Sequence, residues 1–265
     1  MALVVTTWNI NSVRLRIDLV KRLLEETRPD VLCLQEIKCR NDAFPRAALA
    51  ELGYVHQHIV GQKGWHGVAT VSRLPLEELE TPDFCHRGEA RVAASRVADV
   101  TIHNLYVPAG GDEADPDVNP KFAHKLDFLA RMETAYAARS PGGPLLVAGD
   151  LNVAPGEHDV WSHKDLLKVV SHTPIETTTL ERIRERAGLV DLARRQHPPE
   201  HKLFTWWSYR AADWAASNRG RRLDHVWATP ELAERLEPGG WSARTEARGW
   251  DKPSDHVPVT CRFDI

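Results

Sequence analysis

The chain has 265 residues, of which 42% are apolar and 27% are charged, and its formal net charge is −3. This length and composition favour a single globular domain over residues 1–265 and argue against a disordered chain. No run of about 18 apolar residues occurs, so the sequence predicts no membrane span. Because the chain is not basic overall, a nucleic-acid site must be a local cluster of Lys and Arg.

The four cysteines stand apart from one another and form no C-x-x-C pair. This pattern argues against a disulfide framework or a zinc site and fits a reducing compartment. Residues 1–5 are too few and too weakly charged to resemble a signal peptide. We therefore expect a cytoplasmic protein, and nothing in the sequence indicates more than a monomer.

The first elements along the chain are predicted to be strand, helix and strand. The first strand covers residues 3–8, and Ser12 is placed to cap a helix over residues 13–26. The continuous apolar run at residues 31–34 is typical of a strand buried on both faces. A polar pair that includes Glu36 follows it directly.

Further along, strand patterns alternate with two helical ones. Strands are expected over residues 54–59, 67–72, 90–97, 100–107, 144–148, 222–228 and 257–265. Helices are expected over residues 121–138 and 175–187. In the last strand, apolar and polar residues alternate strictly, which indicates one buried and one exposed face. Because hairpins mix with crossovers, we predict an α/β sandwich with mixed sheets rather than a regular doubly wound sheet.

Polar residues gather where these apolar strands end. A lone Asn or Asp after a strand is usually a turn residue, but seven such positions are harder to dismiss. They are Asn9, Asn11, Glu36, Asp150, Asn152, Asp224 and the Asp255-His256 pair. Clustered carboxylates imply a counter-cation, and hard oxygen ligands favour Mg²⁺ or Mn²⁺ over zinc. Together with a histidine, this set suits the hydrolysis of a phosphate ester.

Six ordered motifs resemble those of the exonuclease III family, the AP endonucleases and exodeoxyribonucleases of the endonuclease/exonuclease/phosphatase superfamily. The motifs are WNINSVR at residues 8–14, LQEIK at 34–38, YVP at 106–108, GDLNVAP at 149–155, RLDH at 222–225 and SDHVPV at 254–259. Each is short, but together they occur in the family's order over nearly the whole chain. The resemblance implies a four-layer α/β sandwich of two sheets packed face to face, with helices outside.

The resemblance also implies a role for each matching residue. The implied metal ligands are Asn11, Glu36, Asp150, Asn152 and Asp255, with Glu36 the main one, and the metal is Mg²⁺ with Mn²⁺ as a substitute. The implied phosphate-binding residues are Asn9, Asn152 and His256. The implied catalytic residues are Tyr106, Asp150, Asn152, Asp224, Asp255 and His256.

Within that set, Asp150 would orient or deprotonate the attacking water. Asp255 would fix the tautomer of His256, since a carboxylate bonded to one ring nitrogen does so. Tyr106 would assist phosphate binding or the leaving group, and Asp224 would sit beside the metal or the departing oxygen. The expected reaction is in-line attack by water on a phosphodiester of double-stranded DNA, at abasic sites or 3′ ends.

An aromatic and arginine-rich stretch near residues 204–222 is the expected DNA surface. Arginine neutralises phosphates and a ring can wedge beside a sugar that lacks its base, although any single tryptophan is more often part of the core. The candidate DNA-binding residues are Trp206, Trp207, Tyr209, Arg219 and Arg221. Other cations that either line the duplex or are ordinary surface charges are Lys63, Arg87, Arg91, Lys121 and Lys125.

Two other functions compete with this interpretation. One is a related chemistry, namely the cleavage of phosphoinositide, sphingomyelin or RNA. The other is a nucleic-acid-binding relative that has lost catalysis, against which the intact polar set argues. The balance among abasic-site incision, 3′→5′ exonuclease and 3′-phosphatase activity stays open, as do the number of metal ions, the side chain that enters the DNA and the effect of the unusual loop at residues 156–172.

Overall fold

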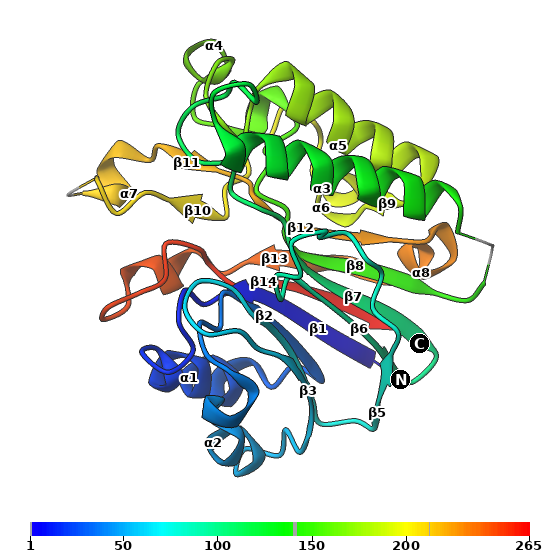
Figure 1. Cartoon of the computed structure of the whole chain (residues 1–265). Coiled ribbons are helices and arrows are strands. Elements are labelled where there is room, and N and C mark those ends of the chain that lie inside the picture. Colours follow the sequence, from blue (N-terminus) through cyan, green and yellow to red (C-terminus); the bar gives the residue numbers. More distant parts are fainter. Residues whose placement is uncertain (1, 140–141, 212) are drawn as a thin grey trace.

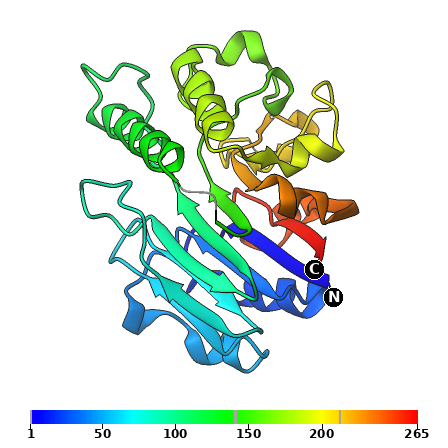
Figure 2. The ribbon, with the colours of Figure 1, turned by 90° about the vertical axis from the view of Figure 1, so that its right-hand side faces the viewer.

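The computed structural model describes residues 2–139, 142–211 and 213–265. Within these residues two six-stranded mixed sheets pack face to face, and helices cover the outer side of each (Figure 1). Figure 2 shows the sheet pair from the side, with α3 and α5 on one flank and α1 and α2 on the other. The predicted four-layer α/β sandwich is therefore confirmed.

The first sheet has the strand order β13-β14-β1-β2-β4-β3. Its strands are β1 (Ala2–Asn9), β2 (Val31–Gln35), β3 (His56–Val60), β4 (Val68–Ser72), β13 (Leu236–Ala243) and β14 (Val259–Asp264). The second sheet has the order β5-β6-β7-β8-β12-β9. Its strands are β5 (Leu76–Leu79), β6 (Val92–Val97), β7 (Val100–Tyr106), β8 (Leu145–Asp150), β9 (Val190–Asp191) and β12 (Asp224–Ala228).

The remaining elements are helices and one short hairpin. The α-helices are α1 (Ile17–Thr27), α2 (Arg46–Ala50), α3 (Pro120–Ala137), α4 (His163–Leu166), α5 (Pro174–Arg186), α6 (Leu192–Gln196), α7 (Trp214–Ser217) and α8 (Pro230–Glu234). The 3₁₀ turns are η1 (Asn41–Ala43), η2 (Glu157–Asp159) and η3 (Thr245–Gly249). The hairpin pairs β10 (Trp206–Trp207) with β11 (Gly220–Arg221).

Three apolar layers hold the sandwich together. The central one lies between the sheets and includes Val5, Cys33 and Phe263, and outer layers join each sheet to its helices. In β14 the predicted alternation is confirmed, because Cys261 and Phe263 are buried whereas Arg262 is exposed. Among the described residues, no helix has both the length and the apolar character needed to cross a bilayer.

The predicted start of the first helix is wrong. Ser12 does not cap it, and α1 begins only at Ile17, with Arg16 at the N-cap position. The intervening backbone is bonded elsewhere, because the N–H groups of Ser12 and Val13 donate to the carbonyls of Glu36 and Ile37, at 2.8 and 3.3 Å. These hydrogen bonds connect the segments that follow β1 and β2, so residues 12 and 13 extend the contact between these two strands instead of starting the helix.

A buried ion cluster fastens β12 to the loop that follows β8. Arg222 donates from Nε and Nη2 to the two carboxylate oxygens of Asp159, at 2.7 and 2.9 Å, and from Nη1 to Asp191 at 2.8 Å. Arg194 also pairs with Asp159. Burial alone would raise the pKa of Asp159, but the charges of Arg222 and Arg194 outweigh it and hold that pKa well below its usual value.

Asp159→Asn is expected to lower the free energy of unfolding by about 3–5 kcal/mol at pH 7, because it removes the carboxylate shared by Arg222 and Arg194 and leaves the buried Arg222 with Asp191 alone. A carboxylate with a depressed pKa stabilises the fold above its unfolded pKa of about 3.9, and that stabilisation is lost as pH falls further. The difference between wild type and variant should therefore shrink below about pH 4. Urea unfolding at several pH values measures it, with Asp99→Asn at an exposed ion pair as the control. A difference that does not change with pH contradicts this account.

Candidate active site

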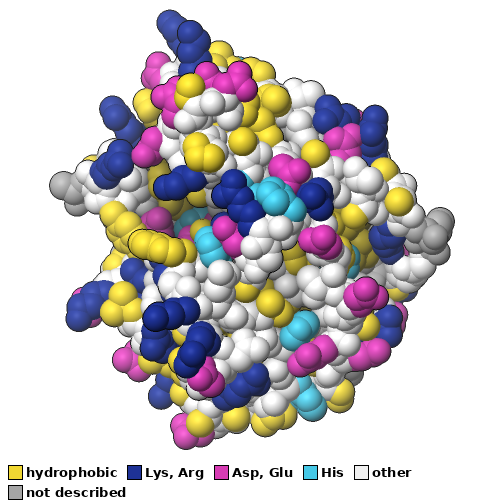
Figure 3. Space-filling model, in the orientation of Figure 1, with side chains coloured by type: hydrophobic (Ala, Val, Ile, Leu, Met, Phe, Trp, Pro, Cys, Tyr) yellow, Lys and Arg dark blue, Asp and Glu magenta, His cyan; other side chains and the backbone are white. Residues whose placement is uncertain are grey.

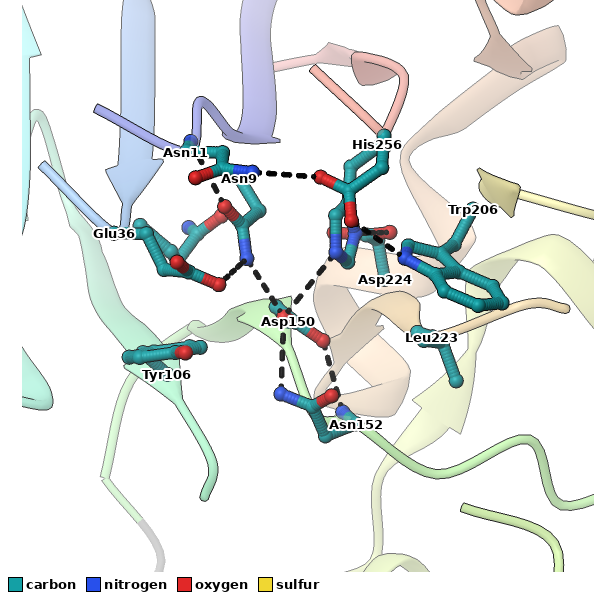
Figure 4. Close-up of polar contacts among 12 residues, drawn as sticks. Asn9, Asn11, Glu36, Tyr106, Asp150, Asn152, Trp206, Leu223, Asp224 and His256 are labelled. Carbon is teal, nitrogen blue, oxygen red and sulfur yellow. Dashed lines mark hydrogen bonds and ion pairs between the residues drawn. The ribbon is translucent and has the colours of Figure 1, made fainter. Parts of the chain in front are cut away.

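Strand register brings the predicted polar residues to one edge of the sandwich. In the second sheet, Asp150 at the end of β8 lies opposite Tyr106 of the parallel strand β7 and opposite Asp224 of the antiparallel strand β12. In the first sheet, Asn9 ends β1 beside Gln35, directly before Glu36. Because the two sheets face each other, these strand ends meet across the sandwich (Figure 4).

The loops that carry the site have unusual backbone conformations. Asn11, Glu36 and Asn152 all adopt left-handed φ angles, of 48°, 50° and 53°. Such conformations are uncommon outside glycine and cluster at functional sites, where the surroundings hold them in place. Just before Asp150, Gly149 has φ of 143°, and a Cβ there would lie 2.0 Å from the carbonyl oxygen of Leu105. Only glycine therefore allows β7 and β8 to approach so closely beside the site.

Asn9 and Asn152 connect the acidic residues of the site. The Asn9 amide donates to Glu36 Oε1 at 2.9 Å and to Asp150 Oδ2 at 2.8 Å, which joins the two sheets. The Asn152 amide donates to the same Asp150 oxygen at 3.0 Å, and its backbone N–H donates to Asp150 Oδ1 at 2.9 Å. Both Asp150 oxygens are thus oriented by amide donors.

The surroundings raise the pKa of both Asp150 and His256, for different reasons. Burial raises the pKa of Asp150 to about 7, and Asp224 and Glu36 add to the rise while His256 opposes it. Burial lowers the pKa of His256, but Asp224 and Asp150 outweigh it and raise it to about 10. The two side chains lie 3.7 Å apart, from His256 Nε2 to Asp150 Oδ2. The site therefore holds a histidine that favours its charged form beside a carboxyl group that titrates near neutrality.

Asp224, rather than Asp255, orients His256. His256 Nδ1 lies 2.8 Å from Asp224 Oδ2. Asp255 instead accepts from Asn11 Nδ2 at 3.1 Å and from Trp206 Nε1 at 2.9 Å. The expectation that Asp255 fixes the tautomer was wrong, because adjacent side chains leave the chain in different directions. Asp224, expected beside the metal or the departing oxygen, lies behind the imidazole.

Asp224→Asn is expected to move the alkaline limb of the pH–rate profile to lower pH. Three carboxylates raise the pKa of His256, and the substitution removes the largest of these effects, that of Asp224, while burial, which lowers the pKa, remains. The protonated form is then lost at lower pH. The profile of kcat/KM against pH measures this, with Asp255→Asn as the comparison. A larger shift in Asp255→Asn than in Asp224→Asn contradicts the assignment.

The donor set beside Glu36 fits a hard cation. The ammonium group of Lys38 lies 2.9 Å from Glu36 Oε2 and 2.6 Å from Asn11 Oδ1, so it bridges two oxygens that the sequence assigned to a metal. Carboxylate and amide oxygens are ligands of Mg²⁺ and Mn²⁺. The sequence analysis did not single out Lys38, although it stands in the same motif as Glu36.

Comparisons with known proteins agree with this geometry. The model of the Endonuclease/Exonuclease/phosphatase family matches residues 6–256. The chain belongs to this family. It is 32% identical to an exodeoxyribonuclease III of Haemophilus influenzae, covering 97% of this chain and 98% of that protein.

Two solved structures share this fold over nearly the whole chain. An AP endonuclease from Archaeoglobus fulgidus is 33% identical and superposes with a TM-score of 0.92 over 99% of this chain and 100% of that one. A 3′ phosphatase from Neisseria, bound to a product DNA hairpin, is 32% identical with a TM-score of 0.90 over 99% of this chain and 100% of that one.

In this endonuclease/exonuclease/phosphatase family member, a cleft of about 690 Å³ opens onto the site. Figure 3 shows Lys and Arg side chains on both sides of a hollow in which histidine and acidic groups are visible. The segment at residues 156–172, which the sequence marked as unusual, forms one wall of the cleft. The residues of this segment that line the cleft are Trp161, Leu166, Val169, Val170 and Ser171. Trp206 and Leu223 line the cleft as well. Sequence analysis did not predict Leu223, because it searched for polar residues at strand ends and Leu223 is apolar.

The predicted DNA-binding residues divide into two groups. Trp206, Arg219 and Arg221 line the cleft, where Arg219 stacks on Trp161 and Arg221 on Trp206, at 4.7 and 5.2 Å from the ring centres. Tyr209 is half-exposed beside it. Trp207 also lines the cleft, but it is only 3% exposed and its ring packs in the core, so it offers DNA far less surface than Trp206 does. Successive side chains of β10 point to opposite sides, which explains why one ring is more exposed than the other.

Two of the additional basic residues are also buried. Arg91 is stacked on the Tyr106 ring, 4.8 Å from its centre, and donates to the Tyr106 carbonyl at 3.2 Å. Lys125 pairs with the buried Glu176 at 2.5 Å and donates to the carbonyl of Asn152 at 2.7 Å. Neither is the surface charge that we expected. Both brace site residues from behind, at sequence separations that the chain alone did not reveal.

Proposed function

We propose that this chain is a Mg²⁺-dependent DNA repair nuclease that hydrolyses phosphodiesters of double-stranded DNA with water, with Mn²⁺ as a substitute ion. The observation that carries the proposal is the meeting of three residues at one cleft with basic walls. Glu36 and His256 line the cleft, and the buried Asp150 lies 3.7 Å from His256 and is linked to Glu36 through Asn9. A binding protein needs neither a metal site nor a buried carboxylate and histidine side by side, so the geometry favours an enzyme over a non-catalytic relative.

The ion is proposed to be held by Glu36 and Asn11. Asp150, Asn152 and Asp255 are proposed to bind it either directly or through water molecules. Magnesium keeps several waters and takes few carboxylates, so not all five residues need to contact it. When bound, it supplies positive charge to the phosphate oxygens as the reaction proceeds.

Asp150 is proposed to orient the attacking water and to accept its proton. A general base works best when its pKa lies near the operating pH, and burial brings the pKa of Asp150 to about 7. Asn9 and Asn152 fix the carboxylate from two sides, and their amides also suit contacts with the phosphate.

His256 and Tyr106 are proposed to act on the phosphate. His256 favours its charged form, and Nδ1 is occupied by Asp224, so Nε2 is the nitrogen available to a phosphate oxygen. Burial and the neighbouring Glu36 raise the pKa of Tyr106 well above its usual value, which keeps the phenol protonated. It is therefore suited to donate a hydrogen bond to the phosphate or to the leaving oxygen.

The DNA substrate is proposed to carry abasic sites or 3′ ends, as the names of the three relatives suggest. Trp206, Arg219 and Arg221 are proposed to contact it. Arg221 is fixed by hydrogen bonds to the Val170 carbonyl and Ser171 Oγ, at 3.0 and 2.7 Å. Arg219 stacks on the Trp161 ring, an arrangement that leaves its charge available to a phosphate. We also propose a cytoplasmic monomer, which four free, buried cysteines suit.

A direct test compares hydrolysis rates on three duplexes, with an abasic site, a 3′-phosphate and a recessed 3′ end. Each is assayed with EDTA and after addition of Mg²⁺, and Asp150→Asn protein purified in the same way controls for contaminating nucleases. We expect metal-dependent cleavage of at least one duplex, and the ratio of rates identifies the main activity. Binding of all three duplexes without cleavage would instead support the non-catalytic alternative.

A further inference from the structure

A second cluster of metal-ligating side chains lies outside the active site. Cys85 and Glu89 come from the segment between β5 and β6, and His124 comes from the first turns of α3. One ligand atom from each residue lies within 4.8 Å of those of the other two. Among the described residues, the only other such group is Asp150, Asp224 and His256.

The closest pair of the cluster has the spacing of two ligands on one ion. Cys85 Sγ lies 3.4 Å from His124 Nε2, and both side chains are buried. Zinc binds sulfur at about 2.3 Å and nitrogen at about 2.0–2.1 Å, which places such ligands about 3.6 Å apart in a tetrahedral site. The pair therefore needs to move by only a few tenths of an ångström.

We propose that Cys85, Glu89 and His124 form a second divalent-metal site, selective for zinc-like ions rather than for Mg²⁺. Thiolate and imidazole are ligands that favour zinc, whereas magnesium prefers oxygen. On binding, the Cys85 thiol loses its proton to solvent and the thiolate coordinates the ion. The sequence argued against zinc because it has no C-x-x-C pair, but here the partners of Cys85 are supplied by the fold.

The surroundings of the cluster leave an entry route and an open position. A cleft of about 520 Å³ is lined by Cys85 and Glu89, and it gives a hydrated ion access to both. Three protein ligands leave the fourth tetrahedral position to water.

Glu89 links this cluster to the active site. Its Oε2 now pairs with Arg91 Nε at 2.6 Å and lies 3.9 Å from His124 Nδ1, while its Oε1 lies 3.7 Å from His66. Cys85 lies at Nε2 of the His124 ring, whereas Glu89 lies nearer Nδ1. To bind an ion held between Cys85 and Nε2, Glu89 must therefore leave Arg91, which stacks on Tyr106, and turn toward the Nε2 side of the ring. The nearby guanidinium groups limit affinity, whereas the thiolate and carboxylate together balance the charge of a divalent ion.

Cobalt(II) titration of the full-length, metal-free protein tests this proposal, because a thiolate ligand gives a sulfur-to-cobalt charge-transfer absorption that oxygen ligands do not. We expect this band to saturate at one equivalent and to be displaced by Zn²⁺ but not by Mg²⁺. Glu36→Gln should keep the band, which separates the cluster from the proposed nuclease metal. Cys85→Ser should abolish it, and Cys39→Ser, at another buried free cysteine, should not.

Glu89→Gln supplies a second test in case Cys85→Ser fails to fold, because Glu89 is partly exposed. It should keep the thiolate band but weaken apparent cobalt affinity by at least about tenfold, the scale seen for losses around metal sites. Absence of a thiolate band in the wild-type protein, or its persistence in Cys85→Ser, overturns the proposal. Such a result would leave the cluster as a thiol–imidazole hydrogen bond and would leave the proposed nuclease function untouched.

Discussion

Glu36→Gln is expected to lower the metal-dependent nuclease rate by at least about 100-fold and to raise the Mg²⁺ concentration needed for half-maximal rate. The substitution keeps the shape of the side chain but removes the charge of the main proposed ligand. Loss of several kcal/mol of transition-state stabilisation corresponds to two or more orders of magnitude in rate. Rates measured across a Mg²⁺ titration, with Mn²⁺ in parallel, give both quantities.

Calorimetric titration of the DNA-free protein with Mn²⁺ separates metal binding from catalysis. Glu36→Gln should weaken the heat-detected binding, and Glu77→Gln, at an exposed ion pair on β5, should leave it unchanged. If Glu36→Gln binds Mn²⁺ as the wild type does and its Mg²⁺ titration is unaltered, Glu36 is not the ligand.

Asp150→Asn and His256→Ala are each expected to lower kcat by about 100- to 10,000-fold, the range for general acid–base groups. The double variant should be about as slow as the slower single variant. Both side chains are proposed to act on one phosphate and lie 3.7 Å apart, so removal of either disables the same step. Single-turnover rates at saturating DNA measure the chemical step directly.

A second double variant provides the control for this result. Arg219→Ala, in the cleft wall, is expected to act on DNA affinity rather than on the chemical step. Combined with Asp150→Asn and assayed below saturation, its effect should multiply with that of Asp150→Asn. If the rate reductions of Asp150→Asn and His256→Ala also multiply in their double variant, the two residues act in separate steps.

Sequence analysis predicted the strands well where their residues are continuously apolar or strictly alternating. It predicted which strand ends carry Asn9, Glu36 and Asp150, because a polar side chain that directly follows a buried strand is conspicuous. It failed at Ser12, since the segment before α1 bonds to the Glu36 loop instead of extending the helix. A local capping pattern contains no information about that competing, nonlocal pairing.

Side-chain partners were harder to predict than strand positions. The family resemblance assigned the His256 ring to Asp255 and placed Asp224 beside the metal or the departing oxygen, whereas it is Asp224 that holds the ring. For the adjacent tryptophans of β10, a period of two implies opposite faces without saying that Trp207 rather than Trp206 is the one packed in the core. Lys125 looked like a surface charge because its partner Glu176 is 51 positions away in the chain.

The amino-acid sequence by itself determined the apolar strands, the polar residues at their ends and hence the class of chemistry that these residues can perform. Only the tertiary structure decided which carboxylate pairs with His256, which aromatic ring packs in the core and which cations are buried. The physical reason is that burial and hydrogen-bond partners depend on how two sheets dock. That docking places groups within 3 Å of each other although more than a hundred residues separate Asn9 from Asp150.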